Sequence, residues 1–177
     1  MNGDVFSLKV METERLILRW LTTDDAAFIL ELLNDPTWVR FIGNRGVRTL
    51  EEAGTYIVTG PMVMYARLGF GLFLVELKDA GRTPIGICGL IQRDGLEDVD
   101  LGFAFLTRFQ AQGYGFETAA ATLEYRRDQM GLKRIVGITS IDNVGSSRVL
   151  EKIGMAFEGM IRLWHDPEEL KLFGVEF

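Results

Sequence analysis

The segment from residue 99 to residue 131 constrains the fold more than any other part of this chain. From 99 to 105, large apolar residues alternate with smaller or polar ones, which is the period of a strand with one apolar face. Two glycines follow, and residues 116–130 then show helical spacing up to Gly131, a typical helix end. The sequence therefore predicts a strand, a glycine-rich turn and a long helix in direct succession.

The two glycines of this turn, Gly113 and Gly115, let a ligand approach the backbone without interference from a Cβ atom. The first turn of the helix that follows presents unpaired N–H groups and the positive end of the helix dipole, and both attract phosphate. An anionic cofactor could therefore bind to backbone groups here, although the chain is acidic, with a formal net charge of −6. A strand-to-helix connection that binds no ligand is the alternative interpretation.

Two other phosphate-binding patterns do not fit the turn. A Walker loop requires Gly-Lys-Ser/Thr, whereas Gly115 is followed by Phe116 and Glu117. A dinucleotide fingerprint requires a third glycine where this chain has Thr118. A dinucleotide-dependent enzyme is therefore a weak alternative.

The other segments predict one mixed α/β domain over residues 1–177, a length typical of a single domain. Thr22 and Thr49 each begin a helix, and Asn34-Asp35-Pro36 ends the first of these helices. The further elements that we expect are a helix at 146–153 and strands at 16–20, 70–77, 84–91, 135–138, 157–164 and 170–177.

The composition excludes several classes of site and partner. A single cysteine, Cys88, excludes an intrachain disulfide framework and a Cys-based zinc site, and a single histidine, His165, excludes a multi-His metal site, so we expect no metal. Cys88 lies in an apolar segment, where a buried, inert thiol is expected. The acidic charge argues against nucleic-acid binding. The chain has neither an apolar window of about 18 residues nor a secretory signal, so we expect a cytoplasmic protein with no membrane partner.

A second polar group follows the strand predicted at 135–138. The amide side chain of Asn143 is suited to hydrogen-bond an amide-bearing ligand, and Ser146 stands at the head of the next predicted helix. Each of the two residues could instead simply cap that helix.

Residues 110–115 are Gln-Ala-Gln-Gly-Tyr-Gly, a full match to the pattern Gln/Arg-x-x-Gly-x-Gly/Ala. That pattern is typical of the acyl-CoA loop of the Gcn5-related N-acetyltransferase (GNAT) superfamily, which this chain resembles over residues 12–177. The opening at 14–19 and the segment from Asn143 to Gly154 look like the RimJ/RimL-like branch, which acetylates the N-termini of ribosomal proteins. The resemblance implies a single-domain acyl-CoA N-acyltransferase fold with a mixed, mostly antiparallel sheet flanked by helices.

The resemblance implies acetyl-CoA as the acetyl donor, with CoA as a product. Amides of the loop would hold the CoA pyrophosphate, and the strand before the loop would pair with the pantetheine arm. An amide near Phe105 would stabilise the thioester oxygen during attack, and Asn143 would bond the pantetheine. The residues assigned to the cofactor in this way are Phe103, Phe105, Gln110, Gln112, Gly113, Tyr114, Gly115 and Asn143.

The reaction implied is direct transfer, which needs a base for the amine and a proton for the departing thiolate. Asp100 is the predicted base, because the branch often carries Glu at this place; a solvated strand start shared with Glu97 and Asp98 is the alternative. Many relatives supply the proton from a Tyr seven residues after the Asn, where this chain has Leu150. Ser146 is the substitute that the resemblance suggests.

The acceptor implied is a primary amine, either a protein N-terminal α-amine or a small molecule. Trp38, Phe41 and Tyr65 lie in the helical region that forms one acceptor wall in relatives, and core packing is the alternative for them. A catalytically weak acyl-CoA-binding module remains a competing function. The sequence leaves open whether the protein is a monomer or a homodimer.

Overall fold

The computed structural model describes residues 8–177, which form one eight-stranded sheet with the order β1-β2-β3-β4-β5-β6-β8-β7. All neighbouring strands are antiparallel except β5 and β6, so the predicted mixed, mostly antiparallel α/β fold is confirmed. The strands are β1 (Lys9–Glu12), β2 (Leu16–Arg19), β3 (Leu72–Leu77), β4 (Pro84–Ile91), β5 (Asp100–Phe105), β6 (Arg134–Ser140), β7 (Ala156–Ile161) and β8 (Leu170–Glu176).

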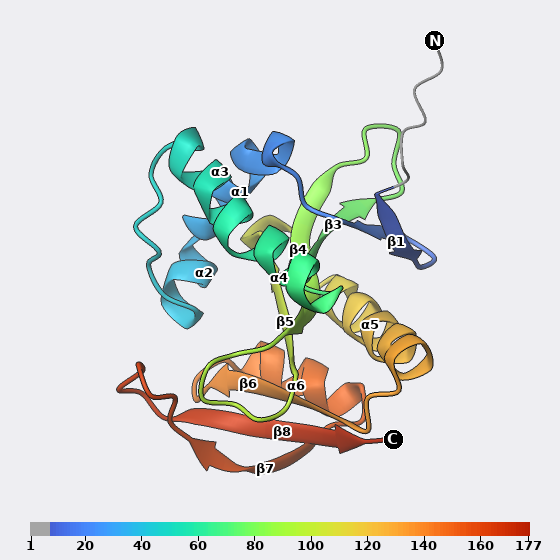
Figure 1. The fold of residues 1–177 in the computed structure, drawn as a ribbon, viewed down its shortest axis with the longest axis vertical. Helices are drawn as coiled ribbons and strands as arrows, with labels where there is room; N and C mark the ends of the chain where they lie inside the picture. Colours follow the sequence, from blue (N-terminus) through green and yellow to red (C-terminus); the bar gives the residue numbers. More distant parts are fainter. Residues whose placement is uncertain (1–7) are drawn as a thin grey trace.

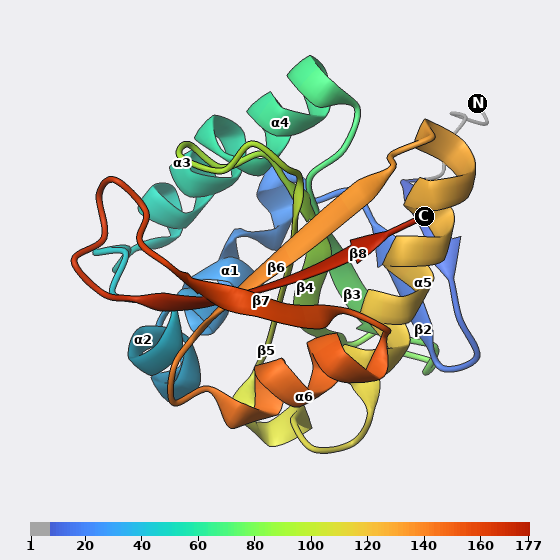
Figure 2. The ribbon, with the colours of Figure 1, turned by 90° about the horizontal axis from the view of Figure 1, so that it is seen from below.

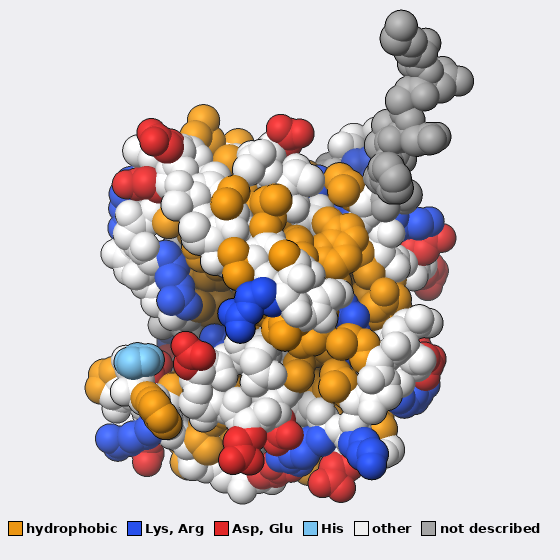
Figure 3. Space-filling view, viewed as in Figure 1, with side chains coloured by type: hydrophobic (Ala, Val, Ile, Leu, Met, Phe, Trp, Pro, Cys, Tyr) orange, Lys and Arg blue, Asp and Glu red, His pale blue; other side chains and the backbone are white. Residues whose placement is uncertain are grey.

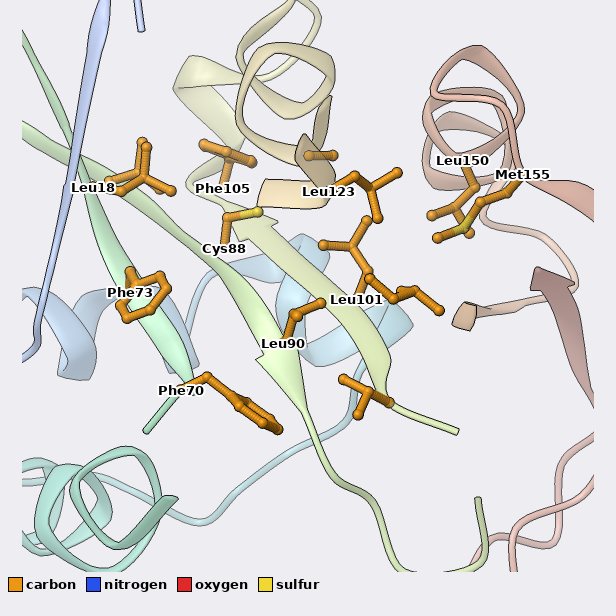
Figure 4. Close-up of a cluster of buried hydrophobic side chains, with 14 of the residues drawn as sticks. Leu18, Phe70, Phe73, Cys88, Leu90, Leu101, Phe105, Leu123, Leu150 and Met155 are labelled. Atoms are coloured by element: carbon orange, nitrogen blue, oxygen red, sulfur yellow. The ribbon is translucent and has the colours of Figure 1, made fainter. Parts of the chain in front are cut away.

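Helices cover both faces of the sheet (Figures 1 and 2). Helices α1, α2 and α3 pack on one face, against Leu74, Ile87 and Leu106. Helices α5 and α6 pack on the other face, against a cluster that includes Phe73, Cys88 and Leu101 (Figure 4). The helices are η1 (Thr23–Asp25), α1 (Ala26–Leu33), α2 (Pro36–Phe41), α3 (Leu50–Thr59), α4 (Pro61–Leu68), η2 (Thr107–Phe109), α5 (Tyr114–Met130) and α6 (Val144–Lys152).

Burial on both faces explains why β3 is apolar at nearly every position. Phe73 and Leu74 are both fully buried, yet they belong to the two different clusters because successive strand side chains point to opposite faces. The only charged residue inside this strand, Glu76, is buried in ion pairs with Arg19 and Arg82.

The sheet opens between β5 and β6. The two parallel strands share one register pair, Asp100 with Val136, and the Val136 amide donates to the Val99 carbonyl at 3.0 Å. Beyond this pair the strands separate, and β6, β8 and β7 cross below β5 (Figure 1). The C-terminal half of β5 therefore has a free edge that faces β6 across a gap.

Two α-helices (α2 and α4), the short helix η2 and one strand (β1) were not predicted. The residues Asn34-Asp35-Pro36 end α1, as expected, but they also begin α2, since Asp35 caps it by accepting from the Thr37 amide and Pro36 occupies the first turn. Pro61 likewise occupies the first turn of α4. Strand β1 is only four residues long and largely solvent-facing, so it carries no apolar signal. The strand predicted at 157–164 ends earlier, at Ile161.

Cys88 should resist alkylation in the folded protein. Its side chain is fully buried, and this burial raises the pKa of the thiol to about 11, so almost no reactive thiolate is present near neutral pH. We expect no adduct when the native protein is incubated with iodoacetamide, and complete labelling after unfolding in guanidinium, both read by mass spectrometry. Rapid labelling of the native protein would contradict the burial of this side chain.

No helix within residues 8–177 combines the length and the apolar character needed to cross a bilayer.

Candidate active site

A cavity of about 1030 Å³ opens where β5 and β6 separate. Its walls come from β5, the end of β6, the first turns of α5 and α6, the helices α2 to α4, and the loop between β7 and β8. The space-filling view shows this side of the molecule hollowed, with apolar side chains in the hollow and basic ones at its rim (Figure 3). Nine of the ten predicted site residues line the cavity: Asp100, Phe103, Phe105, Gln110, Gly113, Tyr114, Gly115, Asn143 and Ser146. The tenth, Gln112, lies in the same turn but is not among the lining residues.

The turn at residues 110–116, here called the glycine turn, presents a row of free amides. Ala111 and Gly113 have φ values of 58° and 85°, and α5 begins immediately afterwards at Tyr114. From Ala111 to Phe116, no backbone N–H donates to an acceptor within the described part of the chain. Six consecutive donors at the start of a 17-residue helix form a site suited to a phosphate-bearing ligand.

Side chains hold the glycine turn in place from outside. Arg15 donates to the Gln112 carbonyl at 3.0 Å and to Glu117 at 2.7 Å, and its guanidinium lies 4.4 Å from the centre of the Tyr114 ring. Gln110 donates through Nε2 to the Phe105 carbonyl at 2.9 Å. Its side chain therefore ties the turn to the end of β5, which is a positioning role.

The hydrogen-bonding register between β4 and β5 determines which amides of β5 point into the gap between β5 and β6. The Leu106 amide donates to the Ile85 carbonyl of β4 at 3.0 Å. Because backbone groups alternate in direction along a strand, the amides of Phe103 and Phe105 point away from β4 and toward the gap. Their position fits the predicted pairing of this strand with an extended ligand.

Asp100 lies at the opposite end of β5 and is 1% exposed. Its Oδ2 accepts from Arg93 Nε at 2.5 Å, whereas its buried Oδ1 has no partner within residues 8–177. Burial raises the pKa of the carboxyl to about 6, although the Arg93 guanidinium acts to lower it. The alternative of a solvated acidic residue is therefore wrong for Asp100, and a buried carboxylate with this pKa is suited to general-base chemistry.

The length of β5 separates two of the predicted catalytic groups. At about 3.3 Å per residue, Phe105 lies roughly 16 Å from Asp100 along the strand, while Phe103 lies roughly 10 Å from it. Asp100 and the Phe105 amide are therefore too far apart to contact one reacting carbonyl group. The Phe103 amide is the gap-facing donor that lies nearer to Asp100.

The start of α6 brings Asn143 and Ser146 to the same cavity. Asn143 Oδ1 accepts from the Ser146 amide at 3.1 Å, so the helix-cap interpretation holds for Asn143. Its Nδ2 makes no hydrogen bond with any described residue, which leaves a donor for a ligand. Leu150 is buried against Gly137, and the hydroxyl of Ser140, which also lines the cavity, is buried without a partner in the described chain.

The helical wall differs in part from the prediction. Trp38 and Phe41 line the cavity, whereas Tyr65 packs in the core against Trp20 and donates to the Leu72 carbonyl. Arg45, Tyr56, Arg93 and Ser140 are among the lining residues that were not predicted from the sequence. These four residues come from segments that lie far apart in the chain, and no pattern in the neighbouring sequence indicates that they share a cavity.

The chain is similar in sequence and in fold to known proteins. The family model described as the acetyltransferase (GNAT) domain matches residues 15–156. The uncharacterized N-acetyltransferase YnaD of Bacillus subtilis is 30% identical over 150 residues, which cover 85% of this chain and 84% of that protein. A GNAT-family acetyltransferase structure from Bacillus anthracis is 26% identical, with a TM-score of 0.76 over 94% of this chain and 97% of that chain.

A ribosomal L7/L12 α-N-protein acetyltransferase, RimL, solved in complex with coenzyme A, has a TM-score of 0.80. The match covers 96% of this chain and 98% of that chain at 16% identity, so it is a likeness of fold. The family-model match spans most of the chain and agrees with the fold and with the glycine turn. The chain therefore belongs to the GNAT acetyltransferase family, and the enzyme class predicted from its sequence, an N-acetyltransferase, is confirmed.

Proposed function

We propose that this enzyme transfers the acetyl group of acetyl-CoA directly to a primary amine. The observation that carries the proposal is the row of free amides in the glycine turn, placed at one end of a cavity whose other end holds a buried carboxylate. Acetyl-CoA, when bound, supplies an activated thioester carbonyl. A linear ligand with an anionic end and a reactive end fits such a cavity.

The backbone of the glycine turn holds the CoA pyrophosphate. The amides of Gln112, Gly113, Tyr114 and Gly115 and the N-terminus of α5 supply the donors, without a basic cluster. The free edge of β5 at Phe103 and Phe105 accepts the pantetheine arm as an added strand. Asn143 Nδ2 and the unpartnered Ser140 hydroxyl provide further polar contacts along the gap.

Asp100 takes the proton from the amine. With a pKa of about 6, it is mostly ionised at neutral pH and yet basic enough to accept a proton. The Phe103 amide, rather than the Phe105 amide of the sequence prediction, stabilises the negative charge on the carbonyl oxygen, because it lies closer to Asp100 along β5. The Ser146 hydroxyl directs a proton to the sulfur atom of the departing thiolate.

Two acceptor classes follow from the family. A protein N-terminal α-amine is supported by the fold likeness to RimL and by the RimJ/RimL-like sequence segments. A small-molecule amine is the second class. The assay is thiol release from acetyl-CoA with a panel of peptides and small amines, alongside calorimetric binding of CoA. Tight CoA binding without thiol release from any acceptor would contradict the proposed reaction.

A catalytically weak acyl-CoA-binding module is the second candidate, favoured by the packed Leu150 where many relatives carry Tyr. Replacing Ser146 with Ala distinguishes the two candidates. An enzyme loses turnover but keeps its CoA affinity, whereas a binding module has no turnover to lose.

Asn143→Ser should weaken CoA binding by about fivefold, since one hydrogen bond contributes about 1 kcal/mol. Serine keeps an oxygen that can cap α6 but removes the Nδ2 donor, so the fold is preserved. Isothermal titration with CoA measures the change in Kd, and the melting temperature should stay within about 2 °C of wild type. Wild-type affinity in this variant would show that the Asn143 amide only caps the helix.

A further inference from the structure

The cavity carries a second set of donors near Asp100, here called the acceptor end and formed by Arg45, Tyr56 and Arg93. Arg45, in the loop between α2 and α3, is exposed and makes no ion pair or hydrogen bond with a residue between 8 and 177. Arg93 uses its Nε to bond Asp100, so both of its terminal nitrogens remain available. Two cations thus have unused donors at this end of the cavity.

Tyr56 lines the cavity together with the two arginines. Burial raises the pKa of its hydroxyl, and the charges of both Arg45 and Arg93 act to lower it, so both cations are within electrostatic reach of this hydroxyl. The Tyr56 hydroxyl makes no hydrogen bond to another described residue. Together the three side chains present a group of donors, of which only Arg93 is paired with a carboxylate of the described chain, that of Asp100.

Trp38 supplies an independent observation. Its side chain lines the same cavity and is 5% exposed, and its Nε1 is buried without a partner in the described chain. A buried N–H without an acceptor is unfavourable unless a ligand supplies one. This N–H is a further unused donor of the cavity wall, on the α2 residue next to Thr37, whose side chain contacts Thr107 and Gln110.

Two further carboxylates line the cavity and can attract a positively charged amine. Asp94 and Asp166 line the cavity beside Asp100 and His165. Asp166 Oδ1 already accepts from the Glu168 amide at 2.9 Å, which leaves its second oxygen and Asp94 available. Acidic groups here attract an ammonium, whereas Arg45, Tyr56 and Arg93 attract an anion, and a zwitterion satisfies both.

We propose that the acceptor is a small zwitterion, an amine that carries its own carboxylate, as a free amino acid does. The carboxylate binds to Arg45, Arg93 and Tyr56, and the amine lies at Asp100. This inference rests on the proposed acetyl transfer and specifies its substrate class. The transfer forms the amide C–N bond and breaks the thioester C–S bond, and the proton lost by the amine balances the one gained by the thiolate.

The test compares free amino acids with their α-amides as acceptors, because the two differ in the carboxylate alone. Thiol release is measured for phenylalanine, alanine and glutamate against the corresponding amides, and also for short peptides. We expect kcat/KM to be at least tenfold higher for the free acids. Calorimetry on the CoA-loaded protein should show binding of the acid and at least tenfold weaker binding of its amide.

Arg45→Gln should reduce the preference for acid over amide by about tenfold, through KM for the acid. The matched control is Arg67→Gln, an exposed arginine of α4 that does not line the cavity and should keep the wild-type preference. Equal use of acids and amides, a preference for peptides, or an unchanged ratio in Arg45→Gln would overturn the zwitterion assignment. In each of these cases thiol release from the amide or peptide still supports acetyl transfer, whereas silence with every amine contradicts the proposed function itself.

Discussion

Asp100→Asn should lower kcat/KM for acetyl transfer by about 10²- to 10⁴-fold, the range expected when a general base is removed. The asparagine oxygen can still accept the hydrogen bond from Arg93, so the geometry around the site is kept. In the wild type, the carboxylate is the active form, and the rate should fall as the pH drops below about 6. The variant should lose this dependence, which a pH–rate profile from about pH 5 to pH 8 measures.

The same substitution should not destabilise the protein. A carboxyl whose pKa is raised from 3.8 to about 6 is harder to ionise in the folded state than in the unfolded chain, which costs the ionised native protein about 3 kcal/mol. The contribution of Asp100 to the free energy of unfolding of the wild type therefore falls as the pH rises from about 4 to about 6. The neutral asparagine does not ionise and so avoids this cost. A melting temperature at or above that of wild type, together with unchanged CoA affinity, separates a catalytic role from a structural one. Full activity in Asp100→Asn would exclude Asp100 as the base.

Phe73→Ala should lower the free energy of unfolding by about 3 to 5 kcal/mol, the usual cost of truncating a fully buried phenylalanine. The ring is completely buried in the cluster between the sheet and α5 (Figure 4). It also makes an edge-on contact with Trp20, at 5.2 Å between centroids. For a chain of this length we expect the melting temperature to fall by about 10 °C. Chemical denaturation measures the change directly.

Phe73→Leu is the matched control for this prediction. Leucine retains most of the apolar volume, so the loss should be about 1.5 kcal/mol or less. Similar losses in both variants would indicate that the cavity left by alanine is not the cause. The glycine turn lies elsewhere in the fold, and CoA affinity at low temperature should be kept in both variants.

The sequence predicted best where local chemistry decides the structure. The alternation before the glycine turn, the two glycines and the helix stop at Gly131 lie next to one another, and each requires its conformation without help from distant residues. Helix α2 was not predicted because one proline can end a helix and also begin the next, and only the cap by Asp35 distinguishes the two outcomes at Pro36.

The acceptor end was not predictable for a different reason. Arg45, Tyr56 and Arg93 lie on a loop, a helix and a second loop, and nothing in their own neighbourhoods marks them. Only the packing of α3 across the sheet brings these side chains to one cavity. The buried state of Asp100 is likewise a tertiary property, because three acidic residues stand within four positions of the strand start and look alike in the sequence.

The two ends of the cavity come from separate stretches of the chain. Residues 36–64 supply most of the helical wall at the acceptor end, while residues 103–116 supply the strand edge and the glycine turn. Substitutions in residues 36–64 can change which amine binds in the cavity while the contacts with the coenzyme stay the same. Descendants of one ancestral protein can thereby diverge to new substrates by altering a few helical positions, without rebuilding the machinery that handles the thioester.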